Sequence, residues 1–206
     1  MLVGSLRGIG LFRSRLSIED DAHELRPRGD LFSTATRSPS LQSEWLRWRD
    51  IERERRVAWA SFEYDCSLCT LTNRRGAIDL SELPTYLPCT EALWQASSAQ
   101  AWQALHTHSP PAARDASLPT VLRNLLGAKP LSLTVSSWGK RLCSQIVGRL
   151  LWDLKQLEAA WISDFLGITS LHCAQRQMKE SLLHAFSSLS TSMTVATTSS
   201  ELIHFK

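Results

Sequence analysis

The sequence predicts an all-α protein, an irregular array of helices, and three observations support this class. Apolar residues recur every three or four positions over long stretches, which is the spacing of one face of an α-helix. No alternating apolar and polar run bounded by hairpin turns is present. Eight prolines and nine glycines are few enough in 206 residues to leave room for long helices.

The first long helical pattern begins after residue 40. We expect a short amphipathic helix within residues 1–17, a polar loop over 18–40, and then a helix capped by Ser43 that ends at residues 73–76. Charged pairs three and four residues apart support a solvated side of that helix. These pairs are Asp50–Arg53, Glu52–Arg55 and Glu52–Arg56, and the apolar side holds Trp45, Trp48, Ile51, Ala58, Trp59, Phe62, Cys66 and Cys69.

Shorter elements are expected in the middle of the chain. Prolines make 77–88 a connector, and Thr90 and Ser98 are expected to cap short helices that reach Trp94 and Leu105. A polar loop over 106–117 precedes a helix at 118–126, closed by Gly127.

Two further helices are predicted in the second half. Apolar residues continue at helical spacing from 135 to 165, where Gly167 ends the pattern, and Ser170 begins a last helix. Ten of the last twenty residues are Ser or Thr, so we expect residues 187–206 to form a flexible, disordered tail.

Composition narrows the class of protein. A net charge of +3 is too small for a protein that coats nucleic acid, and no run of eighteen apolar residues predicts a membrane span. Five cysteines without a secretory signal favour reduced thiols in the cytosol or nucleus over a disulfide framework. Eight tryptophans indicate extensive packing between helices.

The candidate chemical sites are weak. Cys66 and Cys69 form half of a zinc site, and the pair His106 and His108 has the wrong spacing to complete it. Neither a dinucleotide motif nor a phosphate loop is present, and no nucleophile has an identifiable base and orienting group. The arginines of 47–56 alternate with acids, which favours a solvated helix face over a nucleic-acid patch. We therefore expect no catalytic residue and no metal ligand in this chain.

Three linked segments resemble the fungal-specific transcription factor domain, the middle homology region of fungal zinc-finger regulators. The family shows a W-x-x-W-x-x-x-E-x-x-R-R-x-x-(W/F)-x-x-F-x-x-D helix, then an L-P-C-x-x-x-x-W turn and a short W-x-x-L helix. The positions that match, with weaker resemblance continuing to Leu157, are Trp45, Trp48, Glu52, Arg55, Arg56, Trp59, Phe62, Asp65, Leu87, Pro88, Cys89, Trp94, Trp102 and Leu105.

The resemblance implies a scaffold rather than an active site. Arg55 and Arg56 lie ten and nine residues before Asp65, about 14 Å along a helix axis, so each is expected to bridge to a neighbouring element. Trp94 is expected to enter a groove beside the long helix. The stretch 73–76 departs from the proline-containing turn of the family, so that loop is expected to differ.

The resemblance also implies a function. It indicates the regulatory or effector portion of a nuclear transcription factor that acts in RNA polymerase II transcription. Zinc and DNA binding would reside in a module not present in this chain. Partners would be other domains of the full-length factor and a co-regulator protein or small effector, with no membrane and no cofactor here.

The predicted domain organisation has three parts. Residues 1–40 would be an N-terminal helix and loop, 41–186 an incomplete regulatory domain, and 187–206 the tail. An alternative reading starts from Arg7, Arg13 and Arg15 in an N-terminus that has no acid before Glu19. It is a helical adaptor or a mitochondrial protein that these arginines target.

Overall fold

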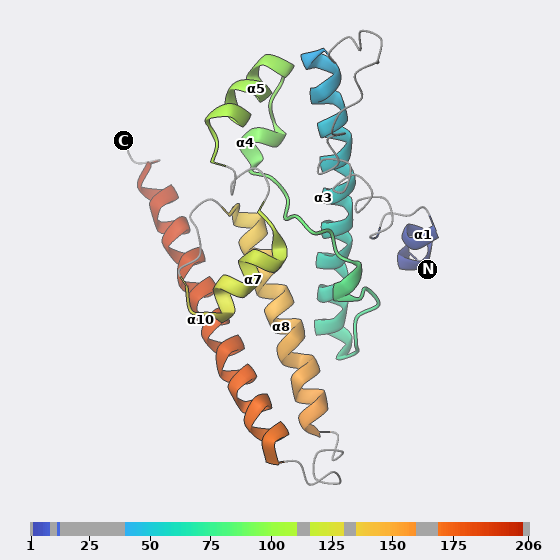
Figure 1. Cartoon of the computed structure of the whole chain (residues 1–206), viewed down its shortest axis with the longest axis vertical. Coiled ribbons are helices and arrows are strands. Elements are labelled where there is room, and N and C mark those ends of the chain that lie inside the picture. The colour runs from blue at the N-terminus through green and yellow to red at the C-terminus, as the bar shows by residue number, and fades with distance from the viewer. Residues whose placement is uncertain are drawn as a thin grey trace, which may run out of the picture. The chain divides into compact units, whose positions relative to one another are not determined.

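The structure is a computed structural model that describes residues 2–8, 12, 40–110, 116–129, 135–159 and 169–203. Within these ranges the regular structure is helical, and the β-pairing consists of one isolated antiparallel bridge between Tyr86 and Ser117. The predicted all-α class is confirmed (Figure 1).

The helices fall into two compact units, Met1–Leu118 and Pro119–Lys206, which are described separately. In chain order the elements are α1 (Leu2–Gly8), α3 (Leu41–Thr72), the 3-10 helix η1 (Leu80–Glu82), α4 (Glu91–Trp94), α5 (Ala99–His108), α7 (Leu118–Leu126), α8 (Ser137–Ala159) and α10 (Thr169–Ile203). Helix α1 covers the first part of the predicted 1–17 helix, and the predicted loop at 18–40 lies outside the described residues apart from its last residue, Ser40.

The N-cap of helix α3 lies three residues earlier than predicted. Ser40 is the N-cap, and its hydroxyl oxygen accepts a hydrogen bond from the Ser43 backbone N–H at 3.3 Å. The Ser43 hydroxyl instead donates to the Ser40 carbonyl oxygen at 2.7 Å, so the prediction that Ser43 caps the helix is wrong. The predicted C-terminal stop is confirmed, because Asn73 follows the last helical residue in the left-handed conformation with φ 49°.

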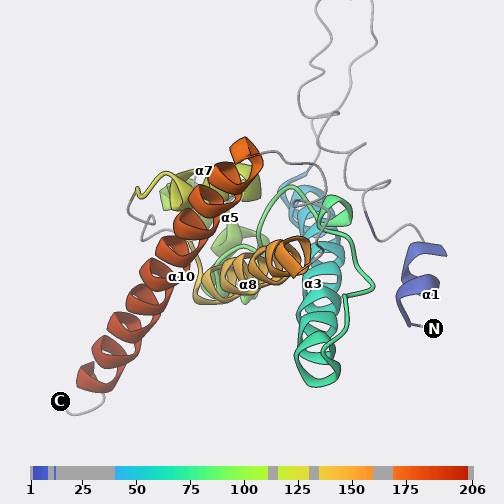
Figure 2. The ribbon, with the colours of Figure 1, turned by 90° about the horizontal axis from the view of Figure 1, so that it is seen from below.

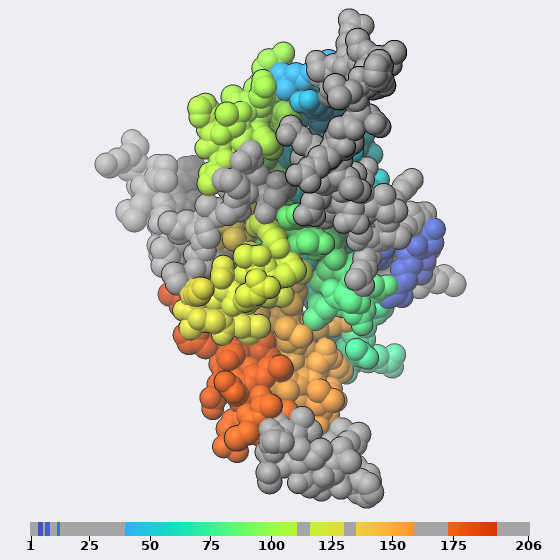
Figure 3. Space-filling view, viewed as in Figure 1, coloured from blue at the N-terminus to red at the C-terminus, as the bar shows by residue number. Residues whose placement is uncertain are grey.

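The segment after α3 turns back and runs beside it (Figure 1). This segment carries η1 and α4 and then leads into α5, which packs against α3. Figure 3 shows the surface of α5 against that of the first turns of α3. The largest fully buried apolar side chains of this unit are Trp59, Phe62, Ile78, Leu87 and Leu93. The core of this unit therefore lies between α3 and the returning segment.

The two predicted caps in this segment behave differently. Ser98 caps α5, because its hydroxyl oxygen accepts the Ala101 N–H at 3.2 Å, as predicted. Thr90 occupies the N-cap position of α4 but makes no side-chain cap hydrogen bond. Helix α5 continues to His108, so the predicted loop at 106–117 begins too early.

The sequence predicts where helix α7 ends but not which residue adopts the left-handed conformation after it. The helix stops at Leu126, as predicted, but the left-handed residue is Ala128 (φ 55°) and not Gly127. The Lys129 N–H donates to the Asn124 carbonyl at 2.9 Å and the Ala128 N–H to the Leu125 carbonyl at 3.2 Å. These two bonds form a Schellman motif that satisfies the last helical carbonyls.

Helices α8 and α10 pack against each other in opposite directions (Figures 1 and 2). Helix α8 covers part of the predicted 135–165 pattern, and Gly167 lies outside the described residues. Helix α10 begins at Thr169, one residue before the predicted start, and continues to Ile203.

Over residues 187–203 the structure differs from the expected tail, because these residues belong to α10. The buried stripe of Leu182, Ala185 and Leu189 carries the helical pattern across the proposed boundary at 187. Ser and Thr lower helix propensity by only about 0.5 kcal/mol per residue, which packing of a neighbouring apolar stripe outweighs. Residues 204–206 lie outside the described residues.

Candidate functional site

The most organised polar feature is a buried carboxylate, that of Glu52 at the middle of α3. Its side chain is fully buried, and it accepts hydrogen bonds from Arg55 Nη1 at 2.8 Å and Arg56 Nε at 3.2 Å. Its Oε1 atom also accepts the backbone N–H of Cys89 at 3.0 Å. An unpaired buried charge is costly, so two guanidinium groups and a backbone donor together make this burial tolerable.

Arg56 extends this cluster to α4. Its Nη1 donates to the Glu91 carboxylate at 3.0 Å, and its Nη2 donates to the Cys89 carbonyl oxygen at 3.3 Å. Its guanidinium carbon also lies 4.7 Å from the centre of the Trp94 ring, which is a cation–π geometry. A planar fork with five donors can make all of these contacts at once, which an ammonium group cannot.

Two more side chains of α3 hold the same returning segment. The indole N–H of Trp59 donates to the Tyr86 carbonyl oxygen at 2.9 Å. The carboxylate of Asp65 accepts the backbone N–H groups of Ala77 and Ile78 at 3.0 and 3.1 Å. The sequence-based expectation of a bridge to a neighbouring element is confirmed for Arg56 and Asp65, whereas Arg55 donates to Glu52 of the same helix.

These side chains of α3 satisfy backbone groups of the segment that returns along the helix. Residues 77–90 are largely irregular but carry buried side chains, and buried backbone groups without partners destabilise a fold. Side chains of α3 supply those partners at Ala77, Ile78, Tyr86 and Cys89. Four residues do so, namely Glu52, Arg56, Trp59 and Asp65, and we call them, together with Arg55, which pairs with Glu52, the backbone clamp.

The prediction that the Glu52 pairs lie on a solvated face is wrong. The Glu52 side chain is 0% exposed, and its partners Arg55 and Arg56 are 9% and 14% exposed. Only Asp50–Arg53 of the three predicted pairs has the expected exposure, with both side chains above 60%. The spacing of Glu and Arg is the same in both cases, so the difference comes from the segment that covers Glu52.

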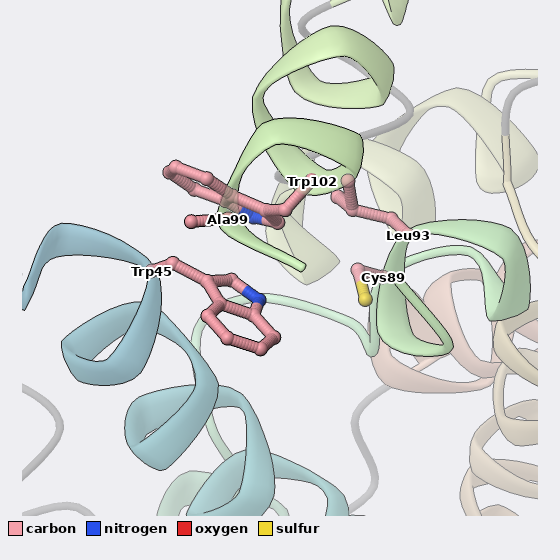
Figure 4. Close-up of a cluster of buried hydrophobic side chains, with 5 residues drawn as sticks. All are labelled: Trp45, Cys89, Leu93, Ala99 and Trp102. Carbon is pink, nitrogen blue, oxygen red and sulfur yellow. The ribbon is translucent and has the colours of Figure 1, made fainter. Parts of the chain in front are cut away.

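A tryptophan-lined cluster lies at the N-terminal end of α3 (Figure 4). Figure 4 shows Trp45 of α3 facing Ala99 and Trp102 of α5, with Leu93 and Cys89 beside them. The rings of Trp48 and Trp102 lie 5.6 Å apart between centroids, and Trp102 also stacks on His106. This cluster fixes α5 to α3 mainly by apolar burial.

The remaining residues that match the family motif are placed as follows. Phe62, Leu87, Pro88 and Cys89 are buried in the unit, and Trp94 is half-buried against Arg56. Leu105 stands apart, since 39% of its surface is exposed on the outer side of α5. Their functional roles stay a prediction.

Sequence reasoning missed Tyr86 and Glu91. Tyr86 accepts the Trp59 indole N–H, and its ring faces the Arg55 guanidinium carbon at 5.6 Å. Glu91 is the exposed partner of Arg56. One signal was present for Glu91, because an acid in the first turn after Thr90 is a typical helix start. No sequence pattern links Tyr86 to Trp59.

The thiols are not arranged as a metal site in the described part of the chain. No group of three or more His, Cys, Asp or Glu residues that could hold a metal ion occurs among the described residues. Cys66 and Cys69 are half-buried on α3 and His106 packs on Trp102, in a different part of the unit. Burial raises the pKa of the Cys89 thiol to about 12, with a further contribution from Glu52, and burial alone raises the pKa of Cys143 to about 12.

No helix within the described ranges has the length and apolar character needed to cross a membrane.

Comparison with known proteins identifies the family. The model of the fungal specific transcription factor domain matches residues 5–192. The chain belongs to this family. The match extends beyond the segment from Trp45 to Leu157 that carries the resemblance in the sequence.

One curated relative of this chain is a fungal zinc finger protein. The zinc finger protein klf1 of Schizosaccharomyces pombe is 33% identical over 96 residues, which is 47% of this chain. That alignment covers 12% of the length of the relative. No solved structure matches the chain.

Proposed function

We propose that this chain is the regulatory and effector portion of a fungal zinc-finger transcription factor that acts in the nucleus on RNA polymerase II transcription. The family match over residues 5–192 is the observation that carries the proposal. The relative named as a zinc finger protein supports it. In this proposal DNA and zinc are bound by a separate module of the factor, and these helices modulate its output.

The buried charged side chains hold other parts of the fold in place, which also supports a regulatory scaffold over an enzyme. Glu52, Arg55 and Asp65 are buried, and the two carboxylates accept hydrogen bonds from arginines of α3 and from backbone N–H groups. A general acid or a nucleophile needs access to a substrate. In this structure the clamp instead fixes residues 77–90 and α4 relative to α3. Partners on this proposal are other domains of the factor and a co-regulator protein or small effector.

The N-terminal helix favours this proposal over a mitochondrial protein. Arg7 donates to both carboxylate oxygens of Glu82 and to the Ala77 carbonyl oxygen at 2.8 Å. One of the three N-terminal arginines is thus engaged in the fold, and the family match begins at residue 5. A fluorescent fusion of residues 1–40 should not enter mitochondria, and a mitochondrial signal would favour the alternative.

The test of a regulatory function is a reporter experiment. Residues 1–206 are fused to an unrelated DNA-binding module in yeast, and transcription of a reporter with the matching site is measured. The fusion should change the output relative to the DNA-binding module alone. Glu52→Ala, which breaks the clamp, should remove the effect, whereas the exposed change Glu180→Arg should keep it. Equal output from the fusion and the module alone would contradict the proposal.

A binding experiment tests the proposal that DNA and zinc are bound by a separate module. The purified chain should show no sequence-specific DNA binding in a gel-shift assay and no stoichiometric zinc by mass spectrometry of the native protein. Zinc that stays bound in the presence of a chelator would contradict the assignment of zinc to another module.

A further inference from the structure

Helix α3 carries an exposed apolar stripe on the side away from the core. Five large apolar side chains on this helix are 40% or more exposed, namely Leu46 (42%), Val57 (43%), Tyr64 (56%), Leu68 (40%) and Leu71 (82%). At about 100° per residue they all fall within about 35° of one line along the helix. The buried residues Arg55, Trp59 and Phe62 lie on the opposite side of the same helix. We call the exposed set the outer stripe.

Two charged residues interrupt the outer stripe near its N-terminal end. Asp50 and Arg53 lie on the same line, and their side chains are 63% and 64% exposed. Within the chain they form an ion pair at 3.3 Å. The order along the stripe is therefore apolar, acidic, basic and apolar, over Leu46, Asp50, Arg53 and Val57.

This order is complementary to itself when the helix is reversed. The midpoint of α3 between positions 51 and 52 is equally far from Leu46 and Val57, and equally far from Asp50 and Arg53. A second α3 that crosses antiparallel at this midpoint would therefore set Leu46 against Val57 and Asp50 against Arg53. Such spacing is the one by which antiparallel helices pack along a shared seam, and a two-fold axis makes every contact occur twice.

The neighbouring charges agree with the antiparallel direction. Arg47 and Glu54 both lie beside the stripe on the same flank, so the antiparallel crossing also brings Arg47 near Glu54 of the second copy. A parallel pair in register would instead oppose Asp50 to Asp50 and Arg53 to Arg53. Like charges set opposite each other oppose association, so the sequence of charges selects the antiparallel pair.

We propose that this chain forms a two-fold symmetric dimer in which α3 pairs antiparallel with α3 of a second copy, through Leu46, Asp50, Arg53 and Val57. The outer stripe beyond Val57 lies outside this crossing. The contact is short, so the dimer forms with a dissociation constant in the micromolar range, as is typical of small interfaces.

The test is sedimentation equilibrium of the full chain over a range of concentrations. The wild type should dimerise, and Asp50→Arg and Arg53→Asp should each weaken dimerisation by about tenfold or more, because each sets like charges opposite each other. An equimolar mixture of the two variants should restore association, since Arg at 50 then meets Asp at 53 at one contact and the native Arg53 meets the native Asp50 at the other.

Two control variants separate this pairing from general effects. Glu180→Arg changes an exposed charge on α10, and Leu71→Ser removes the most exposed residue of the outer stripe outside the crossing. Both should dimerise as the wild type does, and far-UV circular dichroism should show equal helix content in all variants. A wild type that stays monomeric at about 100 μM would overturn the proposal, as would single charge variants that dimerise as the wild type does, which is the behaviour of a parallel pair.

Discussion

The carboxylate of Glu52 accepts the backbone N–H of Cys89 at 3.0 Å, and this bond connects the middle of α3 to a residue 37 positions later in the chain. The same carboxylate neutralises the buried guanidinium of Arg55 at 2.8 Å. One side chain thus satisfies a buried backbone donor and a buried charge together. The position of α4 relative to α3 depends on it.

Glu52→Ala should be strongly destabilising. The change leaves the guanidinium of Arg55 buried without its anion and the Cys89 N–H without its acceptor. Removing one partner of a buried pair typically costs about 3–5 kcal/mol. The free energy of unfolding, measured by urea titration with tryptophan fluorescence, should fall by about that amount.

An exposed ion pair gives the matched control. Glu158 pairs with Lys179 between α8 and α10 at 2.9 Å, and its side chain is 33% exposed. Glu158→Ala should cost about 1 kcal/mol or less, as surface pairs do. Similar losses for the two variants would show that the Glu52 cluster is not buried in solution.

The sequence predicts the helices well because apolar spacing reports directly on which residues a helix buries. It also predicts that Arg56 and Asp65 reach other elements, since their separation forbids a direct pair. The burial of Glu52 could not be predicted, because a Glu with Arg at three and four residues has the same local pattern on a solvated face. What buries it is the return of Cys89 to α3, a contact distant in sequence. The left-handed Ala128 escaped prediction because Gly127 beside it is the residue usually found in that conformation.

Trp59 and Trp102 should differ in what their indole N–H groups contribute. Trp59 donates to the Tyr86 carbonyl at 2.9 Å, whereas the buried Nε1 of Trp102 has no hydrogen-bond partner within the described part of the chain. Trp59→Phe leaves a carbonyl without its donor, which typically costs about 1–3 kcal/mol beyond the loss of packing. Trp102→Phe removes a donor that is already unsatisfied, so the loss of unfolding free energy should be smaller. An equal or larger loss for Trp102→Phe would contradict this.

The exposed cysteine should react with alkylating reagents faster than the buried cysteines. The pKa of Cys89 and that of Cys143 are both about 12, because burial disfavours the thiolate, while Cys173 is exposed on α10. At about pH 8 iodoacetamide, which attacks thiolates, should modify Cys173 quickly and the two buried thiols only after unfolding. Peptide mass spectrometry with and without denaturant measures this. Rapid labelling of Cys89 in the folded protein would show that the segment around Cys89 separates from α3.

These raised pKa values also predict that the stability of the folded protein falls at alkaline pH. A thiol whose folded pKa lies above its unfolded value contributes stability that is fully present below the unfolded pKa of about 8.5–9. That contribution is lost as the pH rises toward about 12. Replacing Cys89 with Ala should therefore reduce the loss of stability between about pH 9 and pH 11, which thermal unfolding at several pH values can measure.

The contact of α1 should weaken in acid. The hydrogen bond from Arg7 lowers the pKa of the Glu82 carboxyl below its usual value. A lowered folded pKa contributes stability that is present above the unfolded pKa of about 4.3 and is lost as pH falls through the folded pKa. Glu82→Gln should thus be less stable than the wild type at about pH 7 and equal to it at about pH 2. A gap that stays constant with pH would show that Arg7 and Glu82 do not pair in solution.

Ala128→Gly should stabilise the second unit. Ala128 has φ 55° at the end of α7, and the left-handed conformation costs a residue with a Cβ about 1–2 kcal/mol, whereas glycine adopts it freely. Part of that gain is offset by the greater freedom of glycine in the unfolded chain, which leaves a net gain of about 0.5–1 kcal/mol. The reciprocal change, Gly127→Ala, should not stabilise, because the added Cβ would lie 3.1 Å from the Arg123 carbonyl oxygen. Thermal unfolding of both variants distinguishes the two positions, and a loss of stability from both Gly127→Ala and Ala128→Gly would indicate that the left-handed residue is the glycine.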